Sequence, residues 1–272
     1  TAADLILNST LSSGTAGTTI LASKSTDTIG LGTTGDMILS TTELASITAG
    51  SLTIGDGTNG NITVNGVAST DSDQFGALTL NATASGSSVT FGTSDSTFQG
   101  LTVNSENGIT LSSNLTTNGA TTFNADSDAD GAGDFTLATN KTLTTTNNAL
   151  SLTSNNVVLG SGSLISSGTA ATTLLTAQAA TTIGLGTGAG SFSLTNNTLS
   201  QITSGSLSVG NSANGDITIA GVSATSFGTL TLNSGSLITF STSASSFSDL
   251  TLDAGAGVSF DADVTSTGNL SV

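Results

Sequence analysis

The sequence predicts an all-β fold, a parallel β-solenoid of roughly 12 coils with about 20–23 residues in each coil. Short runs such as "ALTL" (77–80) and "LTV" (101–103) alternate apolar and polar residues, which is the period of a half-buried strand. Stretches rich in Gly, Ser, Asn and Asp separate these runs and are typical of turns. The pattern as a whole recurs over a long period, which is the signature of a repeat architecture.

The long repeat is clearest in "TIGLGT", which occurs at 28–33 and again at 182–187. Other matching strings recur at nearly the same offset, and insertions in turns produce the small drift between them. We therefore expect one continuous solenoid over residues 1–272 with a repeat of about 150 residues. The first copy covers about 1–154, and a partial second copy covers about 155–272.

The strands follow one another at short intervals along each copy. In the first copy, we expect strands at "ALTL" (77–80), "VTF" (89–91), "LTV" (101–103), "ITL" (109–111) and "TTF" (121–123). The alternation predicts which side chains face a shared core, namely Leu52, Ile54, Ile62, Val64, Leu78, Leu80, Leu230 and Leu232. It predicts outward positions for Thr53, Thr63, Thr79 and Thr231.

A β-sandwich array is the alternative fold, because short strands with regular turns also build sandwiches. Two features favour the solenoid. The ten Phe are the whole aromatic inventory, so a wide sandwich core would be hard to fill. Identical polar residues also recur at equivalent turn positions, where stacked coils would place like over like.

The composition excludes many kinds of site. The chain has no His, Cys, Trp, Tyr, Pro or Arg, and Lys24 and Lys141 are its only basic residues. Zinc, haem and iron–sulfur sites need His or Cys, and most enzyme mechanisms draw on side chains that are missing here. The net charge of -16 repels nucleic acid and anionic membrane surfaces. Apolar runs fall short of the ~20 residues of a membrane helix. We therefore expect no catalysis, no nucleic-acid partner and no membrane insertion.

Several strings resemble one known class of repeat. "LTIGDGTNGNITVNGV" and "LTVNSENGITLSSNLTTNG" look like the filamentous-haemagglutinin-like β-helix repeats of very large secreted bacterial surface proteins. The resemblance covers nearly the whole chain. It implies a right-handed parallel β-helix, export by a dedicated outer-membrane route, and a place in an extracellular filament or matrix with an adhesin-like role. It therefore implies an extracellular or cell-surface location.

The sharpest site motif is "DSDADGAGD" at 126–134, whose D-x-D-x-D-G start is the opening of a calcium loop. Alternate residues of a tight loop aim their carboxylates at one hard cation, and a glycine permits the sharp turn. The predicted ligands are Asp126, Asp128, Asp130 and Asp134. The bidentate Glu expected at the twelfth position is replaced by Leu137. The sequence therefore predicts Ca²⁺ binding of modest affinity, about 10⁻⁴–10⁻³ M. An acidic turn without an ion is the alternative.

Weaker motifs are expected to be turns. The pairs Asp71/Asp73 and Asp261/Asp263 are typical of solvated surface turns, although each could hold an ion. The glycine-rich "GLGTGAG" (184–190) resembles a phosphate loop but contains no Lys.

The leading functional hypothesis is a structural segment of an extracellular or cell-surface filament, stalk or matrix protein. The alternatives are a glycan-binding adhesive module, a glycan-active β-helix enzyme, and a flat Thr array that binds ice. The expected partners are neighbouring repeats or copies of the chain end to end, together with cell-surface glycans or proteins. The pattern starts and stops partway through a copy, which favours a segment of a longer covalent chain over a complete filament subunit.

Overall fold

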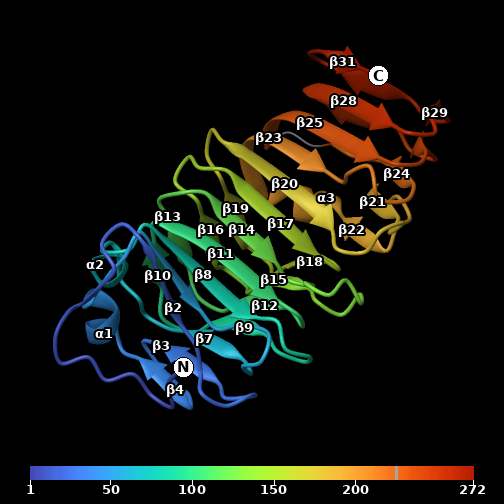
Figure 1. Ribbon diagram of the computed structural model, residues 1–272. Helices are drawn as coiled ribbons and strands as arrows, with labels where there is room; N and C mark the ends of the chain where they lie inside the picture. Colours follow the sequence, from blue (N-terminus) through green and yellow to red (C-terminus); the bar gives the residue numbers. More distant parts are fainter. Residues whose placement is uncertain (224–225) are drawn as a thin grey trace.

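A computed structural model of the chain describes residues 1–223 and 226–272. The chain winds into a rod of stacked coils, with its two termini at opposite ends (Figure 1). All strand pairs within the sheets are parallel, and each strand pairs mainly with its counterparts in the coils before and after it. The predicted parallel β-solenoid is therefore confirmed.

The strands form three faces around one core. The first, called here the long face, has eleven strands. In stacking order they are β2 (Gly17–Ile20), β6 (Ser51–Ile54), β8 (Ala77–Ala82), β11 (Gly100–Ser105), β14 (Thr121–Asn124), β17 (Leu150–Ser154), β20 (Ala171–Thr176), β23 (Ile202–Val209), β25 (Phe227–Ser234), β28 (Asp249–Ala254) and β31 (Leu270–Ser271).

The second face consists of two sheets of shorter strands. One sheet holds β4 (Met37–Leu39), β3 (Ile29–Leu31), β7 (Ile62–Val64), β9 (Val89–Phe91), β12 (Ile109–Leu111), β15 (Phe135–Leu137) and β18 (Val157–Leu159). The other holds β22 (Phe192–Leu194), β21 (Ile183–Gly186), β24 (Ile217–Ala220), β26 (Ile238–Phe240) and β29 (Val258–Phe260).

The third face is the most irregular. Its strands are β1 (Leu11–Ser12), β5 (Ile47–Thr48), β10 (Ser96–Phe98), β13 (Leu115–Thr117), β16 (Thr142–Thr144), β19 (Leu164–Ser166), the first residues of β23, then β27 (Ser245–Phe247) and β30 (Val264–Ser266). In the residues that the structure describes, three short helices interrupt the coils: α1 (Thr41–Ala45), α2 (Ser69–Ser72) and α3 (Asn196–Ser200).

The alternation within each strand determines which residues fill the core. All eight predicted inward side chains are at most 1% exposed. Their stacking is regular, because Ile54 pairs with Leu80 and Leu80 pairs with Val103 in successive coils of the long face. The predicted outward residues Thr53 and Thr79 lie between them on the other side of the sheet and are half-buried. The local apolar pattern is therefore sufficient to place the core.

The outward side of the long face carries an unbroken column of hydroxyl side chains, called here the hydroxyl ladder. It contains one Thr or Ser from every strand of the face: Thr19, Thr53, Thr79, Thr102, Thr122, Ser151, Thr173, Ser208, Thr231, Thr251 and Ser271.

The coils differ in length. Asn81 and Asn104 are stacked partners whose positions differ by 23, and those of Asn233 and Asp253 differ by 20. By contrast, Thr19 pairs with Thr53, so the coil between them is much longer. The coil length expected from the sequence therefore fits the plain coils, while others contain insertions.

The longest coils contain a segment that doubles back. After β3 the chain turns at Gly32 and returns to place β4 parallel to β3, with Ile29 opposite Met37. Strands β21 and β22 repeat this arrangement in the second copy. The order of the strands shows that β4 lies on the edge of β3 opposite to β7, so the chain steps back along the rod before it continues. The second face thereby gains one strand that the long face lacks.

This geometry explains why both copies contain the sequence "TIGLGT". Gly30 lies in the middle of β3, and the returning loop crosses over its outward side. A Cβ atom on Gly30 would lie 2.5 Å from the carbonyl oxygen of Thr33 and 2.6 Å from that of Thr34. In the second copy, a Cβ atom on Gly184 would overlap the carbonyl oxygen of Gly188. Both copies need glycine here because the loop leaves no room for a side chain.

The two copies also share side-chain hydrogen bonds. The Asp4 carboxylate accepts the backbone N–H of Ile38 at 3.0 Å, and the amide oxygen of Asn156 accepts the N–H of Ser193 at 3.2 Å. Both contacts hold the strand that steps back. Asp4 corresponds to Asn156 at an offset of 152 residues and Ile38 corresponds to Ser193 at an offset of 155, close to the 154 residues that separate the two copies of "TIGLGT".

Asp and Asn side chains at the corners connect successive coils. Asp95 accepts the backbone N–H of Asn114 at 3.0 Å and its side-chain N–H at 2.9 Å. Asn114 in turn accepts the N–H of Thr142 at 2.9 Å. These bonds satisfy backbone donors where the strands end, and they lower the pKa of the Asp95 carboxyl.

Candidate metal centre

The loop between β14 and β15 carries the acidic motif, and Asp126 organises it from inside. Asp126 is buried, and its carboxylate accepts the backbone N–H groups of Asp130 (3.1 Å) and Gly131 (3.0 Å). Gly131 has a φ of 90°, a conformation that glycine adopts without strain. The motif therefore folds into a tight turn around its first aspartate.

The environment of Asp126 disfavours its charged form. Burial is the largest influence and raises the pKa of its carboxyl above the usual value, because the carboxylate loses hydration. The hydrogen bonds from the backbone N–H groups of Gly131 and Asp130 oppose this effect, while the side chain of Asp128 and the charge of Asp130 raise the pKa further. A cation held beside the loop would favour the ionised form of Asp126.

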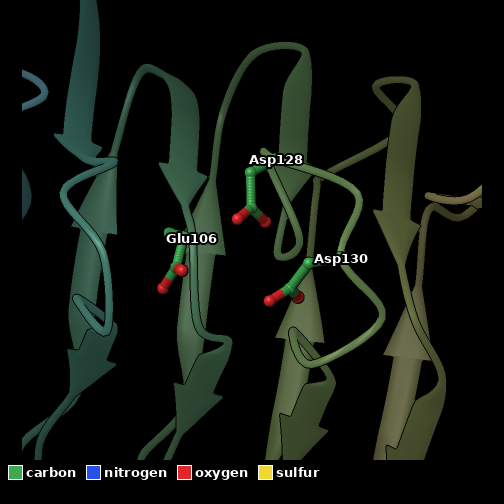
Figure 2. A group of neighbouring side chains, drawn as sticks. All are labelled: Glu106, Asp128 and Asp130. Carbon is green, nitrogen blue, oxygen red and sulfur yellow. The ribbon is translucent and has the colours of Figure 1, made fainter.

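Three other carboxylates converge on one space. Glu106, Asp128 and Asp130 each contribute an oxygen atom, and these three atoms all lie within 4.8 Å of one another. Figure 2 shows the two aspartates of the loop facing Glu106, which follows β11 in the preceding coil. Asp128 and Asp130 are exposed, whereas Glu106 is only 8% exposed. The group is therefore open to solvent on the side of the loop and closed on the side of the rod.

Glu106 is held in place by the coil before it. Its Oε2 atom accepts the backbone N–H of Gly86 at 2.6 Å, and its own N–H donates to the carbonyl oxygen of Ala82 at 3.0 Å. The acidic loop is anchored to the same strand end, because the N–H of Ser127 donates to the carbonyl oxygen of Ser105 at 2.9 Å. Three successive coils thus fix the distance between the loop and Glu106.

The donor set fits calcium. Ca²⁺ takes six to eight oxygen ligands at flexible geometry, and carboxylates serve as one- or two-oxygen ligands. Three carboxylates at this spacing repel one another unless a cation or protons neutralise them. A cation would bind to Glu106, Asp128 and Asp130 and complete its shell with water or backbone carbonyls.

The structure brings two of the four predicted ligands together and gives the other two different partners. Asp128 and Asp130 belong to the group of three. Asp126 is occupied by the backbone of its own turn, and Asp134 accepts the side-chain N–H of Asn155 at 2.9 Å. Sequence reasoning missed Glu106 because it searched one continuous loop. The signal that could have found it is the coil length, since Glu106 precedes Asp128 by the length of one plain coil.

The weaker motifs have structural partners. Asp71 accepts the N–H of Ala68 at 2.9 Å at the start of α2, and Asp261 accepts the hydroxyl of Ser259 at 2.8 Å. Within residues 1–223 and 226–272, neither acidic pair belongs to a group of three metal-ligating side chains. The string "GLGTGAG" begins within β21 and continues as the loop that doubles back to β22.

None of the described helices is long and apolar enough to cross a membrane. Comparisons of the chain with protein-family models, with curated proteins and with solved structures found no match.

Proposed function

We propose that this chain is a structural segment of an extracellular or cell-surface filament, stalk or matrix protein with an adhesin-like role. The observation that carries the proposal is the long face, where eleven parallel strands repeat the same inward and outward pattern from β2 to β31. Such a stack gains length by adding coils without changing its cross-section. It is therefore suited to spanning distance, and we propose no catalytic role for it.

The last coil exposes apolar side chains. Phe260 and Leu270 are 48% and 49% exposed, and they border a hollow at this end of the rod. The string "GVSF" at 257–260 corresponds to "GITL" at 108–111 in the first copy, so Phe260 corresponds to Leu111. Leu111 is completely buried by the next coil. We propose that a neighbouring repeat or another copy of the chain covers the last coil in the same way.

The alternative functions have less support. Glycan-binding proteins commonly stack sugar rings on exposed aromatic side chains, and Phe260 is the only exposed aromatic residue in the described part of the chain. An ice-binding array would need several hydroxyl columns side by side. The long face has one complete column, because Asn81, Asn104 and Asn124 occupy the next outward position on their strands.

Intact cells that produce the protein provide the test. Antibodies raised against the chain should label the outside of unpermeabilised cells, and electron microscopy should place the label on filaments or on a surface layer. Mass spectrometry of the labelled material should find further copies of "TIGLGT". Label confined to the interior of permeabilised cells would contradict the proposal.

We also propose that Glu106, Asp128 and Asp130 bind one Ca²⁺ ion with a Kd of about 10⁻⁴–10⁻³ M. The bound ion would connect the acidic loop to the preceding coil. Its contribution would therefore be to stiffen the rod at this coil in a calcium-rich medium.

Calorimetric titration with calcium chloride tests this second proposal. The parent should bind one equivalent, and Glu106→Gln and Asp128→Asn should each abolish the heat. Asp261→Asn is the matched control, because it removes one exposed acid from a coil outside the group. Absence of heat in the parent would exclude the site. Loss of binding in Asp134→Asn with retention in Glu106→Gln would favour the ligands predicted from the continuous loop.

A further inference from the structure

The long face is the widest sheet surface of the rod, because its strands reach eight residues whereas those of the second face have three or four. Its outward positions are uncharged except at one end, where β28 carries Asp249 and Asp253. The chain carries 18 acidic residues and two Lys, and its net charge is -16. On the described strands from β2 to β25, every outward position of this face is Gly, Ala, Ser, Thr, Asn or Leu. Charge repulsion between two copies is therefore low where the strands from β2 to β25 meet, with β28 beyond the end of this contact.

The face is also large enough for a stable contact. Nine strands lie between β2 and β25 inclusive. At ~4.8 Å between strands and ~3.3 Å per residue along them, the outward area is roughly 700–800 Å². A specific protein interface typically buries about 800 Å² on each partner.

The shape of the long face is complementary to the long face of a second copy. One side of the hydroxyl ladder carries Ala77 on β8, Gly100 on β11 and Ala120 just before β14, and the surface there is hollowed by about 500 Å³. The other side carries Asn81, Asn104 and Asn124 on the same three strands. Small residues thus stand on one side of the ladder and large ones on the other, at equal heights along the rod.

We propose that two copies of this chain associate side by side through their long faces, about a two-fold axis parallel to the rod. This rotation exchanges the two sides of the ladder, so the Asn column of each copy enters the small-residue hollow of its partner. The two hydroxyl ladders then face each other. Each hydroxyl both donates and accepts hydrogen bonds, and both ladders have the same spacing by construction, so one good contact recurs at every coil.

Sedimentation equilibrium of the purified chain tests whether the dimer forms. A species of twice the monomer mass is expected. The affinity of the two copies for each other should rise from 0.15 M to 0.5 M sodium chloride, because salt screens the net charge. Gly100→Glu should weaken the dimer by about a hundredfold or more, since it places bulk and charge in the hollow. A Cβ atom on Gly100 has no neighbour closer than 3.5 Å, so the monomer accommodates the change.

The matched control is Thr110→Glu, at an outward position of β12 on the second face, and it should leave the dimer intact. Circular dichroism should show the same β-structure in both variants. A parent that stays monomeric at millimolar concentration overturns the proposal. So does an equal loss of dimer in the two variants.

Single cysteines test the orientation, because the chain has none of its own. Packed sheets lie about 10 Å apart, so a short bismaleimide that spans this distance is the suitable crosslinker. With it, Thr79→Cys and Thr102→Cys should each form covalent dimers, since a parallel two-fold axis brings each ladder residue to its own counterpart. Thr110→Cys should not. A dimer that forms in solution but does not crosslink at Thr79→Cys would overturn the parallel arrangement.

Discussion

Replacing Gly30 by Ala should destabilise the coil that doubles back, although the change adds one methyl group to an outward position of a strand. The new Cβ atom would lie 2.5 Å and 2.6 Å from two backbone carbonyl oxygens, and Cβ atoms essentially never approach closer than 3.0 Å. The returning loop must therefore move by about half an ångström. Because the obstacle is backbone, rotating a side chain cannot relieve the overlap.

The expected cost follows from two opposing terms. Overpacking a site with one extra carbon costs typically ~1–3 kcal/mol. Replacing glycine by alanine also reduces the entropy of the unfolded chain, which returns ~0.4–1 kcal/mol. Because the obstacle is backbone, we expect a cost near the upper end of the overpacking range, and the net loss in the free energy of local unfolding is therefore about 2 kcal/mol. Gly57→Ala is the control, because its nearest neighbour would be the hydroxyl of Thr83 at 3.6 Å. We expect it to be neutral or slightly stabilising.

Hydrogen exchange followed by mass spectrometry measures this effect where it occurs. A loss of about 2 kcal/mol should speed exchange of the amides of β3 and β4 roughly 30-fold in Gly30→Ala, and leave them unchanged in Gly57→Ala. Gly184→Ala should have the same effect on β21 and β22. Equal exchange in Gly30→Ala and Gly57→Ala would show that the returning loop does not require glycine at this position of "TIGLGT".

Three further outcomes are expected. Leu80→Ala should lower the free energy of unfolding by ~2–5 kcal/mol in urea melts, because Leu80 is completely buried, while the half-exposed Leu270→Ala should cost less than ~1 kcal/mol. Because the pKa of Asp126 is raised, the folded loop binds more protons than the unfolded chain above the usual carboxyl pKa. The stability that this residue contributes therefore falls as the pH rises through the raised pKa, and carboxyl NMR should show that calcium lowers that pKa. The lowered pKa of Asp95 has the opposite effect on stability. The parent should be more stable than Asp95→Asn at neutral pH, and this difference should disappear as the pH falls through that pKa. A difference that persists in acid would contradict this.

The sequence by itself determined the architecture of the stack. The alternation in strings such as "LTI" and "LTL" fixes which side chains face the core, because a strand places successive residues on opposite sides. Each coil pairs with the next through the same positions, so a local pattern is enough to define a long parallel sheet. The long repeat is visible in the sequence because equivalent coils of the two copies use the same pattern of residues.

The tertiary structure alone decided where distant residues meet. Glu106 joins Asp128 and Asp130 because stacking places consecutive coils side by side, and a search within one loop does not include the neighbouring coil. Asp126 opens the strongest local motif, yet the backbone N–H groups of its own turn take its carboxylate, and only their positions in space show this. The step back from β3 to β4 was likewise hidden, because it depends on the path of the loop over Gly30. Local alternation determines the faces of a strand, whereas contacts between coils depend on the length and path of everything that lies between them.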